Sequence, residues 1–220
     1  MKIGVVGSGV LGCFYGARLC RAGQDVHLLL RSDYEVVRDE GLRIDSEEGE
    51  LLVHPHAYDA PEDIGGCDLV IVGLKTTANY RFAELVSPLL DGKTTILCLQ
   101  NGLGNCEQLA ELFGAERVIG GLCFVCLNRI GAGVVRHIAF GKVVLGELGR
   151  PSAERTHAIA GLFKDAQVPC EVSGNLKKSQ WEKLVWNIPF NGLGVASAAG
   201  LQALEDAGTN MPAKLGPVFP

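Results

Sequence analysis

Three polar residues recur at four-residue spacing within the segment "WEKLVWNIPFNGLG": Lys183, Asn187 and Asn191. On an α-helix this spacing places one ammonium group and two carboxamides along a single stripe. The neighbouring side chains are apolar, so the stripe is costly unless it faces a cleft. A helix with an ordinary solvated face is the structural alternative, and Pro189 predicts a kink between the two asparagines.

A lysine in a cleft has a specific use in carbonyl chemistry. Its ammonium group polarises the carbonyl, and it can donate the proton when burial or nearby cations lower its pKa towards neutrality. The two carboxamides can hold hydroxyl and carboxylate groups without adding charge. The pattern therefore predicts Lys183 as a general acid, with Asn187 and Asn191 as substrate ligands, in a carbonyl reduction that also needs a hydride donor.

A glycine-rich turn near the N-terminus is the candidate site for that donor. "GSGVLG" follows a short apolar run and precedes a helical pattern and a second apolar run, which is the context of a dinucleotide-binding βαβ unit. Gly7 permits the turn, Gly9 lets the backbone approach a pyrophosphate, and Gly12 lets helix and strand pack closely. The predicted cofactor-binding segment comprises Gly7, Ser8, Gly9, Val10, Leu11 and Gly12. An ordinary glycine-rich turn is the alternative.

The residue after the second predicted strand indicates which dinucleotide binds. An NAD site usually has an acidic residue there to bind the ribose 2′-hydroxyl, whereas this chain has Arg31. Its planar guanidinium matches a 2′-phosphate, so we expect NADPH as the cofactor. A solvated surface arginine is the alternative, and the nearby Asp33 leaves a weaker NAD-binding mode open.

Two further polar residues follow predicted strands. Lys75 ends "DLVIVGLK", and Asn101 follows "TTILCLQ". Ligands of open α/β sheets collect at the carboxyl ends of the strands. We expect Lys75 on the cofactor side and Asn101 where cofactor and substrate meet, although each could be a plain strand-end residue.

The elements that must position these residues alternate between strands and helices. This order predicts an α/β fold: a Rossmann-type doubly wound parallel sheet, followed by the start of a helical C-terminal domain. We expect a dinucleotide-binding domain at residues 1–172 and a partial helical substrate domain at 173–220. The predicted strands cover 2–6, 25–30, 68–74, 94–99, 117–125 and 133–145, and the predicted helices cover 12–22, 79–90, 105–113 and a long segment from about 176.

Composition narrows the class of protein. A net charge of −5 argues against nucleic acid as a partner, and no apolar run is long enough to cross a membrane. The eight cysteines are scattered, and the one CxxC pair, Cys123 and Cys126, falls in a predicted strand whose faces would separate the two. We expect reduced thiols, no metal site, and a cytoplasmic protein without a signal peptide. The sequence leaves a homodimer open.

These residues together resemble the ketopantoate reductase (2-dehydropantoate 2-reductase) family. The resemblance rests on "GSGVLG", Arg31, Lys75, "QNGLG" and above all "WEKLVWNIPFNGL", and it covers residues 1 to about 200. It implies NADPH-dependent reduction of the 2-oxo acid 2-dehydropantoate to pantoate in pantothenate biosynthesis. It also implies the roles named above for Lys183, Asn187, Asn191, Asn101 and Lys75.

The chain departs from the family pattern near its C-terminus. Pro189 precedes the second asparagine, where the family usually has a proline after it. The family continues into a further helical bundle that contributes to substrate and cofactor binding, so the resemblance marks this chain as C-terminally truncated. Two alternatives remain: a related β-hydroxyacid or 2-oxo acid dehydrogenase, and a non-catalytic NADP(H)-binding protein.

Overall fold

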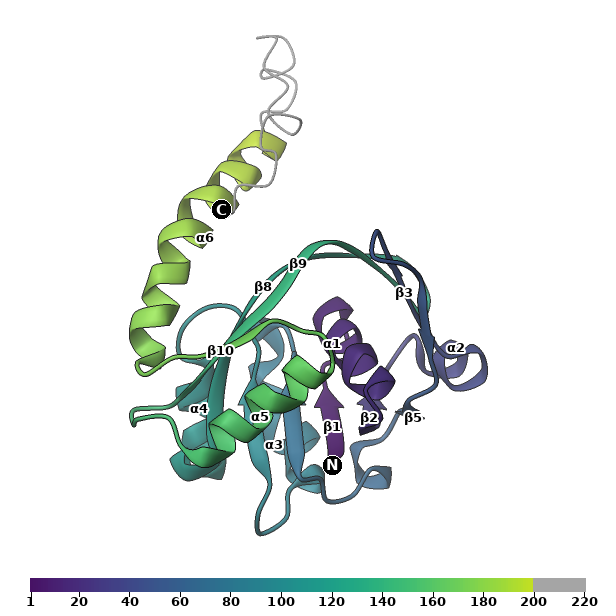
Figure 1. Cartoon of the computed structure of the whole chain (residues 1–220), viewed down its shortest axis with the longest axis horizontal. Helices are drawn as coiled ribbons and strands as arrows, with labels where there is room; N and C mark the ends of the chain where they lie inside the picture. Colours follow the sequence, from purple (N-terminus) through teal and green to yellow (C-terminus); the bar gives the residue numbers. More distant parts are fainter. Residues whose placement is uncertain (200–220) are drawn as a thin grey trace. The chain divides into compact units, whose positions relative to one another are not determined.

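The computed structural model describes residues 1–199, with side chains described for 1–189. A ten-stranded sheet forms its framework (Figure 1). The strands are β1 (Lys2–Val6), β2 (Asp25–Leu29), β3 (Leu42–Ser46), β4 (Leu51–Val53), β5 (His56–Tyr58), β6 (Leu69–Val72), β7 (Thr95–Cys98), β8 (Val118–Gly131), β9 (Val134–Glu147) and β10 (Cys170–Val172).

The strand order contains a reversal at β1. The sheet runs β4-β3-β9-β8-β7-β6-β1-β2-β5, and β10 pairs with β9. From β5 to β8 all neighbours are parallel, and the chain leaves β1 first towards β2 and later returns on its other side at β6. This change of direction is a topological switch point, where open α/β sheets bind ligands beyond the carboxyl ends of their strands.

Helices cover both faces of the parallel part, which confirms the doubly wound α/β prediction. One apolar cluster packs α1 and α5 against one face, and a second packs α3 and α4 against the other. The helices are α1 (Val10–Arg21), α2 (Tyr34–Glu40), α3 (Phe82–Val86), α4 (Asn105–Phe113), α5 (Glu154–Asp165) and α6 (Leu176–Ala199).

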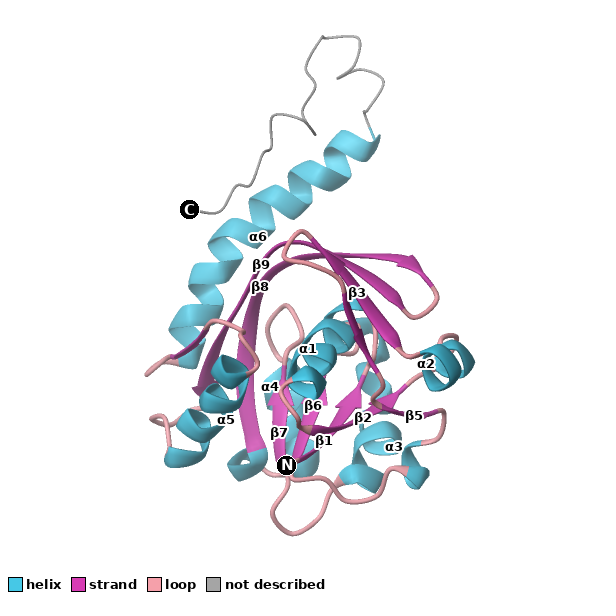
Figure 2. Ribbon diagram, turned by 45° about the vertical axis from the view of Figure 1, so that its right-hand side comes forward, coloured by secondary structure: helices cyan, strands magenta, loops and turns pink. Residues whose placement is uncertain are grey.

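The sheet is mixed rather than wholly parallel. The long strands β8 and β9 are antiparallel partners, and β3 and β4 extend the sheet beyond them. Figure 2 shows β8, β9 and β3 arching over α1. The helix therefore lies between the parallel strands and the outer strands, and it is buried on nearly all sides from Gly12 to Leu19.

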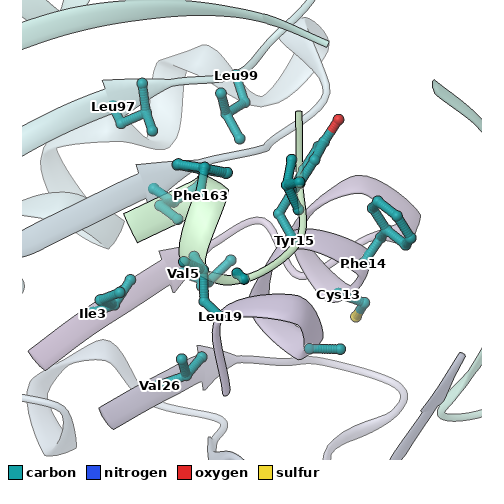
Figure 3. Packing of buried hydrophobic residues seen from close by; sticks show 14 of the residues in the cluster. Ile3, Val5, Cys13, Phe14, Tyr15, Leu19, Val26, Leu97, Leu99 and Phe163 are labelled. Carbon is teal, nitrogen blue, oxygen red and sulfur yellow. The ribbon is translucent and has the colours of Figure 1, made fainter. Parts of the chain in front are cut away.

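Aromatic side chains of α1 fill this enclosed space (Figure 3). Tyr15 is fully buried, contacts Phe163 of α5 edge-on at 5.8 Å between ring centroids, and donates a hydrogen bond to the Gly141 carbonyl at 3.1 Å. The buried hydroxyl is thus satisfied by the backbone of β9. These contacts fix α1, and with it the turn that precedes it.

Several predicted elements are correct and others need correction. The helix at 105–113 is confirmed as α4, and strand β1 has the predicted limits. The helix predicted at 79–90 is wrong: the segment contains only the short α3 between two 3₁₀ turns, Thr76–Arg81 and Ser87–Leu89. Pro88 has no N–H to continue the helical hydrogen bonds, which is one reason that the helix ends.

The chain divides into two compact units, the first from Met1 to Gln180 and the second starting at Trp181. Helix α6 begins in the first unit, where Leu176 is buried in the apolar cluster beside α4. No helix in the part that the structure describes combines the length and the apolarity needed to cross a membrane.

A buried carboxylate joins β9 to α5. Glu147, 2% exposed, accepts two hydrogen bonds from Arg155 at 2.6 and 2.9 Å, one from Thr156 at 2.7 Å and one from Arg150 at 3.0 Å. Burial alone would raise the pKa of Glu147, but these donors outweigh it and lower the pKa to about 2. The charged form is therefore part of the native structure.

We expect acid to remove this contribution to stability. Because the pKa of Glu147 falls from 4.5 in the unfolded chain to about 2 in the folded one, its stabilisation is complete above pH 4.5 and disappears as the pH falls towards 2. Glu147→Gln should lower the free energy of unfolding by roughly 3 kcal/mol at pH 7. Urea denaturation at pH 7, 4 and 3 should show this gap narrowing.

The matched control is Glu84→Gln, which breaks an exposed pair with Arg81 and should cost less than about 1 kcal/mol. A gap between wild type and Glu147→Gln that stays constant with pH would contradict the assigned role.

Candidate functional site

The glycine turn lies at the switch point and is held by backbone contacts. Gly7 follows β1 with φ +91°, and a Cβ at this position would lie 2.3 Å from the backbone nitrogen of Leu74. A Cβ on Gly12 would lie 2.6 Å from the Gly7 carbonyl oxygen. Both glycines are therefore required by the protein's own close contacts, as the sequence predicts.

Gly9 differs from its two neighbours in the motif. Its φ of −78° is available to any residue, and a Cβ placed on it would meet no atom within 4 Å. The fold therefore does not require a glycine here, and the missing side chain leaves the space beside the turn open. Gly9 is also the N-cap of α1, and no described side chain caps that first turn. The turn thus offers backbone N–H groups and the positive end of a helix dipole to an anion.

The segment after β2 carries one exposed arginine and one buried aspartate. Arg31 is exposed on the bend that follows β2. Asp33 is buried, and its carboxylate pairs with Arg129 of β8, accepts a bond from the Ser32 hydroxyl at 3.0 Å and one from the Gly133 N–H at 3.3 Å. The carboxylate that could serve an NAD-type site is therefore already engaged within the protein.

Lys75 and Asn101 lie on the loops that follow β6 and β7, and both are exposed. Lys75 precedes the 3₁₀ turn Thr76–Arg81, and the carbonyl of Asn101 accepts a hydrogen bond from the Asn105 side chain at 3.0 Å. Since β6 and β7 are parallel neighbours, the two loops leave the sheet at the same edge. The strand-end placement predicted for both residues is confirmed, whereas their binding roles remain predictions.

A side-chain network that the sequence analysis missed ties these two loops together. The Gln100 amide donates to the Leu74 carbonyl at 2.9 Å and to Asn79 Oδ1 at 2.8 Å. Asn79 in turn donates to Asn105 Oδ1 at 2.8 Å. Gln100, Asn79 and Asn105 are distant in sequence, so no local pattern links them; the only signal is an amide residue directly before Asn101.

The strand order places the predicted cofactor-binding residues side by side along one edge of the sheet. Arg31, the glycine turn, Lys75 and Asn101 follow β2, β1, β6 and β7, which are consecutive parallel neighbours. At a spacing of about 4.8 Å between strands, the row spans roughly 15 Å. A single elongated ligand lying along this edge could contact all four.

The polar stripe lies on α6 as predicted. Lys183 and Asn187 are half-buried residues of this helix, and Asn191 falls within its backbone although its side chain lies outside the described residues. The helix continues through Pro189 to Ala199. The three residues thus share one helical stripe at i, i+4 and i+8.

The cysteine directly behind the glycine turn, Cys13, is not a reactive thiol. All eight cysteines are free, and Cys13, directly behind the glycine turn, donates from Sγ to the Ser8 carbonyl at 3.2 Å. Burial, aided by the charge of Asp33, raises the pKa of Cys13 to about 12. The thiol is therefore protonated at neutral pH and is a poor nucleophile.

The fold and the edge residues define a Rossmann-type α/β protein with its glycine turn at the switch point. The sequence profile of the family described as ketopantoate reductase PanE/ApbA matches residues 3–150. The chain belongs to this family.

Individual relatives agree with this assignment. The chain is 42% identical over 200 residues to a 2-dehydropantoate 2-reductase of Nostoc sp., covering 88% of this chain and 63% of the relative. It is 32% identical to an uncharacterised oxidoreductase of Bacillus subtilis, over 93% of this chain and 65% of the relative. The crystal structure of a 2-dehydropantoate 2-reductase from Geobacter metallireducens matches with a TM-score of 0.86 and 52% identity, over 88% of this chain and 64% of that one. The chain thus spans less than two thirds of the length of these relatives.

The contrast between Gly7 and Gly9 gives a stability prediction. Gly7→Ala should lower the free energy of unfolding by more than about 3 kcal/mol, because the new Cβ would overlap the backbone of the β6 loop and the backbone is left-handed. Gly9→Ala should cost less than about 1 kcal/mol, because its side chain enters open space. Urea denaturation of the two variants measures this difference; equal costs would contradict the packing argument.

Proposed function

We propose that this chain forms the dinucleotide-binding part and the beginning of the substrate-binding part of an NADPH-dependent reductase that converts 2-dehydropantoate to pantoate. The proposal assigns residues 1–172 to the cofactor and 173–220 to the substrate. The observation that carries it is the row formed by Arg31, the Gly7–Gly12 turn, Lys75 and Asn101 along one sheet edge, in a chain of the ketopantoate reductase family.

The cofactor-binding residues fit NADPH better than NADH. The first turn of α1 suits the pyrophosphate, and the open side of Gly9 leaves room for it. At the end of β2, Arg31 suits a 2′-phosphate, while Arg129 neutralises Asp33 and keeps its carboxylate away from that group. Lys75 and Asn101 belong to the same edge and are assigned to the cofactor, with Asn101 also contacting substrate. When bound, NADPH supplies the hydride.

The proton donor and the substrate ligands are assigned to the polar stripe of α6. Reduction of a 2-oxo acid adds a hydride to the carbonyl carbon and a proton to its oxygen, giving the alcohol. Lys183 donates that proton from Nζ and regains one from water, while Asn187 and Asn191 hold the hydroxyl and carboxylate groups of the substrate. The helical spacing of the three residues and the family resemblance of "WEKLVWNIPFNGL" support these roles.

We also infer a cytoplasmic location, because eight free thiols suit a reducing compartment. The proposed partner is a small 2-oxo acid. Self-association to a homodimer remains a proposal that sedimentation of the chain would test.

The 2′-phosphate assignment predicts a selective loss of affinity. Arg31→Ala should weaken NADPH binding about 10- to 100-fold, the loss expected for a charge-assisted contact, and should leave NADH binding within about threefold. Fluorescence titration with both nucleotides measures the two changes. Arg38→Ala, which removes another exposed arginine on the adjacent helix α2, should change neither; equal losses for NADPH and NADH would remove Arg31 from the phosphate site.

The general-acid assignment predicts a loss of turnover with binding intact. Lys183→Ala should lower kcat for 2-dehydropantoate by about 10²–10⁴-fold, with little change in NADPH affinity. Lys177→Ala removes an exposed lysine from another face of α6 and serves as the control.

Steady-state NADPH oxidation with a panel of 2-oxo acids tests both lysine variants and the substrate. Unchanged kcat in Lys183→Ala would exclude the lysine as proton donor. Turnover confined to other 2-oxo acids would favour the related dehydrogenase, and NADPH binding without any turnover would favour a non-catalytic binding protein.

A further inference from the structure

Two histidines and an aspartate meet at the edge of the sheet that lies opposite the glycine turn. Asp25 and His27 begin β2, and His56 begins β5, where it pairs in register with His27. The Nε2 atom of His27 lies 3.0 Å from Asp25 Oδ1, and the Nε2 atom of His56 lies 3.4 Å from the same oxygen. The three potential ligand atoms all lie within 4.8 Å of one another.

The burial of His27 and the surroundings of its two ring nitrogens suit a metal ligand. Its side chain is 8% exposed, and among the described residues its buried Nε2 has no partner with hydrogen-bond geometry, despite the nearby Asp25 oxygen. The other ring nitrogen, Nδ1, lies 3.2 Å from the Tyr58 hydroxyl. Histidine ligands commonly bond through their second nitrogen in this way, which fixes the ring and directs the free lone pair towards the metal.

The spacing of the atoms suits a tetrahedral ion. Bonds of 2.0–2.1 Å from zinc to nitrogen or oxygen place neighbouring ligand atoms about 3.3 Å apart. The distances of 3.0 and 3.4 Å lie on either side of this value. The rings of His27 and His56 are stacked at 4.7 Å, so His56 must rotate to bring its lone pair onto a shared ion. Its side chain is 63% exposed, which leaves space for that rotation.

The ammonium group of Lys2, which lies on the strand beside Asp25, is bonded to a backbone carbonyl outside the cluster. Lys2 pairs in register with Asp25, but its Nζ donates to the Ile64 carbonyl at 2.6 Å. A cation placed between His27 Nε2 and Asp25 Oδ1 would contact both atoms.

We propose that Asp25, His27 and His56 form a site for one Zn²⁺ ion, with water as the fourth ligand. Two imidazoles and one carboxylate favour a borderline transition metal over Mg²⁺ or Ca²⁺, which prefer oxygen ligands. The bound ion ties the three-residue edge strand β5 to β2. This site is independent of the proposed reductase chemistry, because it lies at the amino ends of the strands.

The experiment uses the untagged 220-residue chain, treated with a chelator and then dialysed free of it. Isothermal titration with Zn²⁺ should show one ion per chain, and His56→Ala and Asp25→Asn should each weaken binding by at least about tenfold. His157→Ala removes an exposed histidine on α5 and should leave the affinity within about twofold. Mg²⁺ should give no binding heat at the same concentration.

Thermal unfolding provides a second readout that does not depend on binding heats. About 100 µM Zn²⁺ should raise the Tm of the wild type and not that of His56→Ala, because an ion bound only by the folded chain stabilises it. Without zinc, Asp25→Asn and His56→Ala should both keep the wild-type Tm, since the side chains of Asp25 and His56 are exposed. A wild type that binds no Zn²⁺ at this concentration would overturn the site, as would affinity retained in both ligand variants.

Discussion

The close contact between two backbones at the switch point is the constraint on which the rest of the structure depends. Gly7 lies against the backbone of Leu74, and Gly12 lies against the Gly7 carbonyl, so neither position has space for a side chain. This contact lets α1 start close to the end of β1, with Gly9 as its N-cap and no side chain capping its first turn. It also brings the loop after β6 beside the turn. A side chain at either glycine would separate helix and strand, and the anion-binding geometry would be lost with the packing.

Polar contacts connect the loops on both sides of the glycine turn to neighbouring parts of the sheet. The Gln100 side chain bonds to the Leu74 carbonyl, so the loop after β7 is attached to the loop that touches Gly7. On the other side, Arg129 reaches from β8 to Asp33 and fixes the bend that carries Arg31. The exposed groups proposed to bind the cofactor thus stand on loops that are tied by polar contacts to a neighbouring loop or strand. Such support keeps binding groups near their productive positions and lowers the entropy lost on binding.

Local patterns were sufficient for part of this arrangement. The glycine spacing and the apolar runs gave β1, α1 and the strand-end residues Arg31, Lys75 and Asn101, because each depends on residues adjacent in the chain. Helix α5 was not predicted, since its start is anchored by Glu147 of β9. Strands β3 to β5 were missed as well: β3 and β4 form a short local pair, but β3 joins the sheet through β9 and β5 joins it through β2, both distant in sequence. Strand β8 continues past its predicted end at residue 125 to Gly131, where exposed polar residues such as Asn128 and Arg129 interrupt the apolar pattern, whereas β9 ends only two residues beyond its predicted limit. The sequence pointed to Asp33 as a carboxylate near the end of β2, but it could not show the ion pair with Arg129, because that pair depends on tertiary contact.

Strand β2 connects the two proposed sites through the same hydrogen-bonded register. Its amino end carries Asp25 and His27, and its carboxyl end leads to Arg31, about 13 Å or more away at the rise of a β-strand. Tyr58 of β5 bonds to both ends: its hydroxyl meets His27 Nδ1, and its carbonyl accepts the Leu30 N–H at 2.7 Å. An ion that fixes β5 through His56 would therefore also restrict Tyr58 and the residue that precedes Arg31. Coupling of this kind is reciprocal, so nucleotide binding at one end of β2 and zinc binding at the other would strengthen or weaken each other by the same factor.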